Sequence, residues 1–371
     1  MRIALFLGSA GSNSGGPERH DIELVRSLTA LDHDSDYLVV CLFPEGPARV
    51  GVQQENVSYE VLAPPIRTVS MLTSLPWAMW RRPVDLWHAT YVPPPIAPKE
   101  YIFTLVCSSM FERPELYPPA IRVRLVALMR RAVAKARYII CISDHIRQVL
   151  IERFGVSNDR LGVIHLGVSE AFRPFAKADC SEFVRKHYAI EHPYFLFSGR
   201  WEPRKNIVRI LEAFAAFKRE TGSEVKMVFS GERTWAAHEA DAVIHRNGLA
   251  AEVIDLGKSP VDELPILYSG AEALVYPSLW EGFGLPIVEG MAAGIPVITS
   301  NNSSMAEVSA DAALLVDPLS VEDIAEAMIR ITADATLAAT MREKGLRRAM
   351  DFTWRHTAQQ TLETYQRLIM L

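Results

Sequence analysis

The sequence predicts an α/β protein with two doubly wound domains, each built on a parallel sheet and facing a common cleft. Short apolar runs alternate with amphipathic stretches almost from the first residue, a pattern typical of buried parallel strands joined by helical crossovers. The chain has 371 residues, which is more than one ordinary core accommodates. The alternation lapses once, at residues 171–193, and then starts afresh. We therefore expect domains at 1–170 and 194–351, with 171–193 as the linker.

The apolar runs place the strands of each domain. In the first domain we expect a strand at 3–7, a Gly/Ser loop at 8–16 and a helix at about 18–31. Further strands of this domain are expected at 37–43, 86–88, 102–106, 138–142 and 161–164. The strands of the second domain are expected at 194–199, 225–231, 253–257, 273–277 and 295–299. Ligands of such sheets bind at the carboxyl ends of strands, so the residues that follow the strands are the candidates for a site.

Composition limits the classes of function. Hydrophobic residues make up 49% and charged residues 22%, a composition typical of a soluble globular protein. The net charge of −5 gives no sign of nucleic acid as the main partner. The four cysteines are scattered without a C-x-x-C pair, so neither a zinc site nor a disulfide framework is indicated, and a reducing cytoplasm fits. Because no apolar run reaches the ~18 residues of a membrane span, any membrane contact is expected to be peripheral.

The first candidate site follows the expected strand at 273–277. Gly282 and Gly284 remove side chains so that the backbone can approach a ligand, and Pro286 suits the first turn of a helix. A helix N-terminus presents backbone N–H groups and the positive end of a dipole to a phosphate. Glu281 lies just before this helix and Glu289 about one turn inside it, so both carboxylates can take the hydroxyls of one ligand. The pattern indicates a sugar-nucleotide site, and a plain turn with two solvated glutamates is the alternative.

The second candidate site follows the expected strand at 194–199. Arg200 and Lys205 lie five residues apart across a turn, so we expect them to converge on one pair of phosphates and to offset the charge that develops on a leaving diphosphate. Solvated surface charges are the alternative interpretation of this run.

Several short motifs of the second half form an ordered set. They are E-G-F-G-L-P-x-x-E at 281–289, Y-P-S before it at 276–278, M-A-A-G-I-P-V after it at 291–297, and G-R-x-x-x-R-K-N at 199–206. This set resembles glycosyltransferase family 4, the retaining transferases of the GT-B fold, and the resemblance runs through nearly the whole chain. It implies two Rossmann-like domains, the first binding the acceptor and the second the nucleotide sugar. It also implies a terminal helix at 352–371 that packs back on the first domain.

The resemblance assigns roles to the residues that match these motifs. Arg200 and Lys205 would bind the donor diphosphate, while Glu281 would bind the hydroxyls of the donor sugar and Glu289 those of the ribose. Sugar and phosphate would be held by the backbone amides of three consecutive residues, Phe283, Gly284 and Leu285.

Two further backbone segments gain roles from the same resemblance. The backbone around Lys258 would meet the base of the nucleotide. Gly15 and Gly16 match a glycine-rich loop whose amides approach the diphosphate and the acceptor, and Glu18 stands where relatives often have another glycine.

Val106 departs from the family pattern. It aligns with a histidine that many members associate with the 6-hydroxyl of the donor sugar. Because valine neither donates nor accepts a hydrogen bond, a 6-deoxysugar donor is one hypothesis. A normal hexose bound by other groups or by water is the other.

Three features carry two interpretations each. His88 follows a strand, where it either lines the acceptor cleft or is a satisfied buried histidine. The D-x-D spacing at 32–34 precedes a strand, so we interpret it as a polar turn and expect no metal site. The Arg-rich helix expected at 120–137 either rests on anionic lipid through residues 122–131 or is an ordinary core-facing helix with a cationic outer side.

The sequence thus predicts a metal-independent retaining hexosyltransferase. The expected donor is a nucleotide-diphosphate sugar carrying mannose or a 6-deoxyhexose such as rhamnose or fucose, and the expected acceptor is a saccharide or lipid-linked hydroxyl in bacterial cell-surface polysaccharide synthesis. One alternative is a catalytically silent sugar-nucleotide-binding subunit. Another is an NAD-dependent two-domain enzyme, although the glycines at 8–16 lack the G-x-G-x-x-G spacing that it requires.

Overall fold

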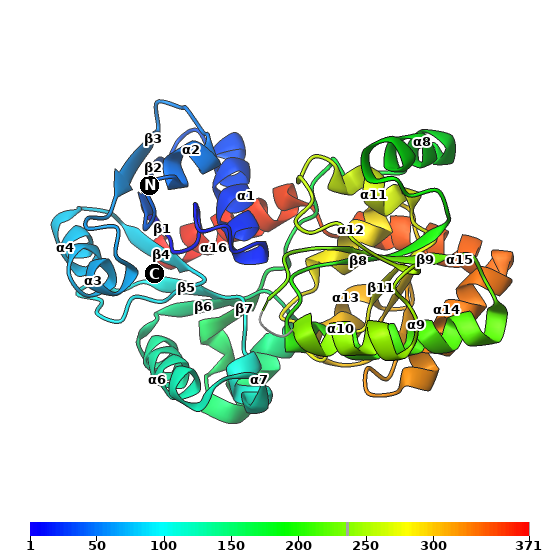
Figure 1. The fold of residues 1–371 in the computed structure, drawn as a ribbon. Helices are drawn as coiled ribbons and strands as arrows, with labels where there is room; N and C mark the ends of the chain where they lie inside the picture. Colours follow the sequence, from blue (N-terminus) through cyan, green and yellow to red (C-terminus); the bar gives the residue numbers. More distant parts are fainter. Residues whose placement is uncertain (235–236, 371) are drawn as a thin grey trace. The chain divides into compact units, whose positions relative to one another are not determined.

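The computed structural model describes residues 1–234 and 237–370. The chain forms two compact units, each of them a parallel sheet with helices against it (Figure 1). The first unit contains residues 1–167 together with the C-terminal residues from 353 onward, and the second contains residues 168–352. The predicted α/β class with two parallel sheets is confirmed.

In the described part of the first unit, seven parallel strands form a sheet in the order β3-β2-β1-β4-β5-β6-β7. These strands are β1 (Arg2–Leu7), β2 (Asp36–Cys41), β3 (Val57–Val61), β4 (Leu86–Thr90), β5 (Ile102–Leu105), β6 (Tyr138–Cys141) and β7 (Leu161–Val163). Sequence analysis missed β3, because it is an edge strand whose residues are only half-buried or exposed and which therefore lacks an apolar run.

The helices of the first unit lie between these strands and after the second unit. They are α1 (Gly16–Leu31), α2 (Gly46–Val50), α3 (Arg67–Leu72), α4 (Ser74–Arg81), α5 (Ser109–Glu112), α6 (Pro119–Lys135), α7 (Asp144–Phe154) and α16 (Trp354–Met370), with 3-10 turns at 114–116 and 158–160. The terminal helix expected at 352–371 corresponds to α16, and Leu371 lies outside the described residues. Tyr365 and Leu368 of α16 lie in the same hydrophobic core as the inner residues of β1 and α1.

In the second unit, the described residues form a sheet of six parallel strands in the order β10-β9-β8-β11-β12-β13. The strands are β8 (Tyr194–Ser198), β9 (Lys226–Ser230), β10 (Val253–Asp255), β11 (Ala273–Tyr276), β12 (Val297–Ser300) and β13 (Leu314–Val316). The helices are α8 (Lys177–Tyr188), α9 (Ile207–Thr221), α10 (Ala237–Arg246), α11 (Leu264–Gly270), α12 (Leu285–Ala292), α13 (Ser303–Ser309), α14 (Val321–Ala333) and α15 (Ala335–Ala349), with a 3-10 turn at 203–205.

The segment at 171–193, which we expected to be a linker, carries helix α8 and belongs to the second unit. Cys180 and Val184 of α8 are buried, and the helix packs against α11. The irregular, charged appearance of the segment in sequence comes from the outer face of α8, most of whose residues are exposed. Across residues 1–234 and 237–370, none of the helices has the length and apolar character of a membrane span.

Candidate active site

The candidate site of the second unit is assembled by two neighbouring strands. β8 and β11 pair in parallel, so their carboxyl ends lie at the same edge of the sheet. The segment after β8 runs through Gly199 into the 3-10 turn at 203–205, and the segment after β11 runs through Glu281 into α12. Sheet topology therefore brings together two motifs that are about eighty residues apart in sequence.

At this edge lies a buried cluster of charges. Glu281 accepts a hydrogen bond from the ammonium of Lys205 through Oε1 at 2.8 Å, and its Oε2 lies 2.6 Å from Nη1 of Arg204. The hydroxyl of Tyr276, the last residue of β11, donates to the same Oε1 at 3.1 Å and also contacts the ammonium of Lys205. The side chain of Lys205 is 10% exposed and that of Glu281 9%. One buried carboxylate thus compensates a buried ammonium and a guanidinium that is 24% exposed.

Burial and the neighbouring charges have opposite effects on the pKa values of Lys205 and Glu281. Burial lowers the pKa of Lys205 to about 8, because the negative charge of Glu281 offsets only part of the desolvation. Burial on its own would raise the pKa of Glu281, but the positive charges of Arg204 and Lys205 outweigh it and bring the pKa to about 2. At neutral pH the carboxylate is ionised and most of the Lys205 population is protonated.

The loop that leads into α12 depends on a glycine. Gly284 caps the helix with φ of +95°, a left-handed conformation that side-chain-bearing residues adopt only at a cost. A Cβ at this position would lie 2.8 Å from the Cδ1 of Ile287. On either side of this glycine, the side chains of Phe283 and Leu285 are buried, and Phe283 packs edge-on against Phe352 at 5.5 Å. The buried side chains of Phe283 and Leu285 fix the loop between β11 and α12.

The same loop is tied to the start of α13. The amide of Glu281 donates to the Ser303 hydroxyl at 3.2 Å, and the Ser304 hydroxyl donates to the carbonyl of Glu281 at 2.9 Å. Arg204 adds a hydrogen bond to the carbonyl of Trp280 at 3.1 Å. The backbone of Glu281 is therefore held from two sides independently of its carboxylate.

Arg200 does not converge with Lys205 in the structure, in contrast to the sequence-based expectation. Its side chain is 48% exposed, and it pairs with Glu202 at 3.3 Å and with Glu232 at 3.4 Å. Glu202 in turn lies 3.4 Å from Arg204, so alternating charges lead from Arg200 to the buried cluster. Arg204 takes the place beside Lys205 that we expected for Arg200, and it pairs with Glu281 at 2.6 Å.

The predicted nucleotide residues occupy two further positions on this unit. Glu289 is buried in α12 and accepts a hydrogen bond from Tyr268 of α11 at 2.8 Å, apart from the cluster around Glu281. Lys258 follows β10 and is exposed, next to Gly257, which has φ of +61°. The carbonyl of Gly257 accepts from the amide of Gly231 after β9 at 2.7 Å, so this backbone lies at the carboxyl edge of the same sheet.

In the first unit, the loop at 8–16 is held by two carboxylates of α1. Asp21, which is fully buried, accepts hydrogen bonds from the amides of Ser9 at 2.9 Å and Ala10 at 3.2 Å. Glu18 accepts from the amide of Gly11 at 2.9 Å, so the residue that replaces a family glycine caps the loop.

Gly15 and Gly16 stand at the start of α1, beyond these carboxylates. Gly15 has φ of +75°, and a Cβ at Gly15 or at Gly16 would meet no atom within 4 Å. The backbone at the N-terminus of this 16-residue helix is therefore open to a ligand.

His88 is a core residue rather than an acceptor contact, so our assignment of it as a substrate residue is corrected. It is fully buried in β4, where Nδ1 lies 2.5 Å from the Tyr365 hydroxyl and Nε2 lies 2.7 Å from the Thr104 hydroxyl. Burial, aided by the nearby His20, lowers the pKa of His88 to about 3, which keeps the ring neutral. The second interpretation of His88, a satisfied buried histidine that ties α16 to the sheet, is the one the structure supports.

The two remaining features of the sequence analysis are Val106 and the D-x-D segment at 32–34. Val106 directly follows β5 and is half-buried. The D-x-D spacing forms a polar turn, in which Asp32 accepts from the amides of Asp34 at 3.0 Å and Ser35 at 3.2 Å and from the Tyr37 hydroxyl at 2.8 Å. Within residues 1–234 and 237–370, no three His, Cys, Asp or Glu side chains gather into a metal-binding group.

Sequence reasoning missed three residues that organise these loops. Arg204 and Tyr276 stood inside the quoted motifs, and the adjacency of β8 and β11 was the signal that would have placed them beside Glu281. Asp21 had a weaker signal, an acid on the buried face of a helix that follows a glycine-rich loop.

Two family models match the chain. Glycosyltransferase Family 4 matches residues 14–172, and Glycosyl transferases group 1 matches residues 181–348. The O-antigen chain mannosyltransferase B of Escherichia coli is 34% identical over 261 residues, which are 70% of this chain and 68% of the relative. The O-antigen chain mannosyltransferase RfbU of Salmonella typhimurium is 30% identical over 208 residues, which are 56% of this chain and 54% of that relative.

Solved structures match the whole fold. Sucrose-phosphate synthase from Thermosynechococcus elongatus has a TM-score of 0.80 at 20% identity, with 99% of both chains covered. Anabaena HepE in complex with UDP-glucose has a TM-score of 0.77 at 20% identity, again with 99% of both chains covered. Fold and matches together define a glycosyltransferase with the GT-B fold. The chain belongs to glycosyltransferase family 4, which excludes the NAD-dependent alternative.

Proposed function

We propose that the protein transfers a hexose from a nucleotide-diphosphate sugar to a hydroxyl of a saccharide or lipid-linked acceptor, with retention of the anomeric configuration, during bacterial cell-surface polysaccharide synthesis. The observation that carries the proposal is the Lys205–Glu281–Arg204 cluster, in which the two cations come from the 3-10 turn at 203–205 and Glu281 from the loop that leads to α12. The names of the two mannosyltransferase relatives support the pathway class.

The cluster suits a leaving diphosphate. Lys205 and Arg204 are cations held in place before any ligand arrives, so they stabilise negative charge on the diphosphate without reorganising when the bond to the sugar breaks. A diphosphate that pairs with these cations takes over part of the role of Glu281, whose carboxylate then accepts hydrogen bonds from the sugar hydroxyls. Arg200, being half-exposed, would reach the diphosphate only by leaving Glu202 and Glu232.

The reaction follows from this arrangement. The bond between the anomeric carbon and the diphosphate oxygen breaks, and the acceptor oxygen forms a new bond on the same face of the sugar. The proton of the acceptor hydroxyl passes to the departing phosphate oxygen, so that the products are a nucleoside diphosphate and a glycoside. We propose that no metal ion takes part, because the two cations beside Glu281 supply the positive charge. Full activity in excess EDTA is the expected result.

The remaining residues of the family motifs are proposed to bind the nucleotide. We propose that Glu289 binds the ribose hydroxyls, that the backbone around Lys258 meets the base, and that the amides of 283–285 bind sugar and phosphate. In the first unit, the open N-terminus of α1 at Gly15 and Gly16 would take the diphosphate or the acceptor. The four free cysteines, of which Cys41 and Cys141 have a pKa raised to about 12 by burial, support a cytoplasmic location.

Two donor sugars are supported by different observations. The relatives are mannosyltransferases, which favours mannose. Val106 favours a 6-deoxyhexose, because an apolar side chain there offers no partner to a 6-hydroxyl. GDP-D-mannose and GDP-D-rhamnose form a matched pair that differs only at carbon 6, so their ratio of kcat/KM decides between the two sugars.

The test begins with a thermal-shift screen of UDP-, GDP- and dTDP-sugars, since a bound donor raises Tm by mass action. The best donor is then assayed for hydrolysis and for transfer to saccharide acceptors. We expect both binding and turnover, and we expect Lys205→Met to abolish turnover, with Lys226→Met on the same unit as control. Binding without any turnover would instead identify a silent sugar-nucleotide-binding subunit, and no binding by any donor would refute the proposal.

A further inference from the structure

The first unit carries a concentrated apolar surface that its own fold does not use. Within the described part of residues 1–167, every exposed large apolar side chain lies between residues 61 and 123. Most of them belong to α3, α4 and the residue before α3, and we call this set the tryptophan face: Ile66, Val69, Leu72, Trp77 and Trp80. Trp77 is 55% exposed and Trp80 62%, an unusual placement for the largest apolar side chain.

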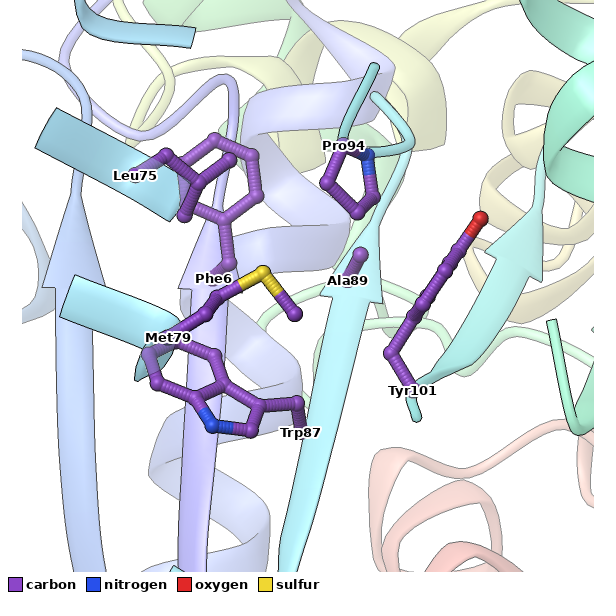
Figure 2. A pocket seen from close by; sticks show the side chains of 7 residues that line it. All are labelled: Phe6, Leu75, Met79, Trp87, Ala89, Pro94 and Tyr101. Atoms are coloured by element: carbon purple, nitrogen blue, oxygen red, sulfur yellow. The ribbon is translucent and has the colours of Figure 1, made fainter. Parts of the chain in front are cut away.

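Helix α4 is anchored by its opposite side. Leu75 and Met79, four residues apart, are buried against Phe6 of β1 and Trp87 of β4, as Figure 2 shows. The cavity left among these side chains measures about 10 Å³, room for one water at most. Because Leu75 and Met79 face the sheet, helical geometry turns Trp77 and Trp80 away from it.

The two tryptophans therefore do not contribute to the core. Their ring centroids lie 5.2 Å apart, so they form one aromatic patch on the outer side of α4. The inner side of the same helix packs against the sheet with a cavity of only about 10 Å³.

The surroundings of the tryptophan face are cationic. Residues 61–84 contain three arginines, at 67, 81 and 82, and no acidic residue. Arg81 and Arg82 share Glu60, at 3.2 Å and 2.7 Å, and both side chains remain more than 40% exposed. The segment with its neighbouring glutamate thus keeps a net positive charge next to exposed indole rings.

The cationic surface continues onto α6. The β3–β4 and β5–β6 connections advance in the same direction across the sheet, so right-handed crossovers place α4 and α6 on the same face of it. Tyr101 joins the two, since it lines the cavity beneath α4 and its hydroxyl lies 3.5 Å from the carbonyl of Ala132 in α6. Helix α6 carries five basic residues and no acidic one, and its Val123 is 65% exposed.

We propose that the tryptophan face, together with the basic side of α6, docks the first unit on the surface of an anionic phospholipid bilayer. Indole rings favour the headgroup level of a membrane, where the ring is desolvated and its N–H stays hydrogen-bonded. Each arginine near an anionic surface adds about 1 kcal/mol of attraction, so the apolar and basic groups supply the two signals that stable peripheral binding needs. This proposal does not depend on the donor or the acceptor proposed above.

Charge favours a bilayer over a second copy of the chain. A two-fold dimer through the tryptophan face would bring Arg67 and Arg81 of one copy toward the same residues of the other. Like charges opposed in an interface cost free energy, whereas anionic headgroups compensate them.

The experiment measures binding of the full-length protein to vesicles. Sedimentation is compared for phosphatidylcholine vesicles and for vesicles that also contain phosphatidylglycerol, with quenching by brominated lipid as a report on insertion. We expect binding only to the anionic vesicles, quenching of tryptophan fluorescence, and an approximately tenfold or larger loss of affinity in Trp77→Ser/Trp80→Ser. Arg67→Gln/Arg81→Gln should weaken binding and reduce its dependence on salt.

The matched control removes exposed apolar side chains from the second unit. Leu315→Ser/Leu319→Ser changes two exposed leucines and should leave vesicle binding unaltered. All substituted side chains are exposed, so an unchanged Tm is expected to verify folding. Absence of binding to anionic vesicles, or equal binding by wild type and Trp77→Ser/Trp80→Ser, would overturn the proposal. So would a concentration-dependent dimer in sedimentation velocity that the tryptophan variant abolishes while vesicle binding persists.

Discussion

The buried charge cluster predicts an unusual order of stabilities. Glu281→Gln leaves Arg204 and Lys205 without their shared counter-charge, and the Lys205 side chain is only 10% exposed. Leaving a buried charge unpaired costs about 3–5 kcal/mol, and we expect about 3 kcal/mol here because Arg204 retains Glu202 at 3.4 Å. Lys205→Met, in contrast, leaves Glu281 paired with Arg204 at 2.6 Å and hydrogen-bonded to Tyr276, so its cost should be about 1 kcal/mol.

The double variant provides the decisive comparison. In the Glu281→Gln background, Lys205→Met removes a desolvated amine that has lost its partner, so it should stabilise the protein by about 1–2 kcal/mol. The coupling energy between the two sites is then about 2–3 kcal/mol. An apolar side chain at 205 is thus expected to destabilise the protein when Glu281 is present and to stabilise it when Glu281 is replaced by glutamine.

The chain has two units, so unfolding must be followed in the second unit alone. Hydrogen exchange in urea, measured by mass spectrometry on peptides from residues 194–300, reports that unit by its own amides. Glu252→Gln is the matched control, because Glu252 also compensates two cations, Lys218 and Lys226, but its side chain is 24% exposed against 9% for Glu281. Its cost should stay below about 1 kcal/mol. If Lys205→Met destabilises equally in both backgrounds, the reasoning is refuted.

Three further outcomes are expected. The kcat/KM for the donor should fall above pH 8 as Lys205 loses its proton. Glu281→Gln should move this fall to lower pH, because the negative charge of Glu281 raises the pKa of Lys205 and so opposes the effect of burial. A pH-rate profile in which the fall stays at the same pH would contradict this. Tyr365→Phe should cost about 1–3 kcal/mol in urea unfolding, since it leaves one nitrogen of His88 buried and unpaired, and a cost near zero would exclude that role. Asp21→Ala should release the amides of Ser9 and Ala10 and raise the KM for the donor. A lower Tm with an unchanged KM would show that the residue has only a structural role.

How much the sequence predicts depends on whether a residue acts locally or across the sheet. Most strands were found as short apolar runs, including β7 and β10 at two of the sheet edges. At the other two edges, β3 was missed because Ser58 and Glu60 interrupt its apolar run, and β13 was missed although its residues, Leu314–Val316, are all apolar. Gly284 was expected to let the backbone approach a ligand, and its φ of +95° shows a separate, conformational reason for glycine that the prediction did not include. The roles of the site residues stay predictions.

The arginine that pairs with Glu281 could not be predicted from the local sequence. Both Arg200 and Arg204 precede α9 in the same short segment, and nothing in their spacing tells which guanidinium turns inward. That choice is made by the pairing of β8 with β11, which sets Glu281 beside the 3-10 turn at 203–205.

The structure also explains why a lysine, costly to bury, occupies the centre of this site. Without Glu281, desolvation would push the pKa of Lys205 still further below its ordinary value, and the ammonium would be neutral at the pH where it must meet a diphosphate. Glu281 keeps the proton on Lys205 while the site is empty. In the reaction we propose, an incoming diphosphate brings its own negative charge, and the carboxylate oxygens of Glu281 would then be available to the hydroxyls of the sugar. One glutamate can in this way hold the cation ready in the free enzyme and orient the donor in the complex.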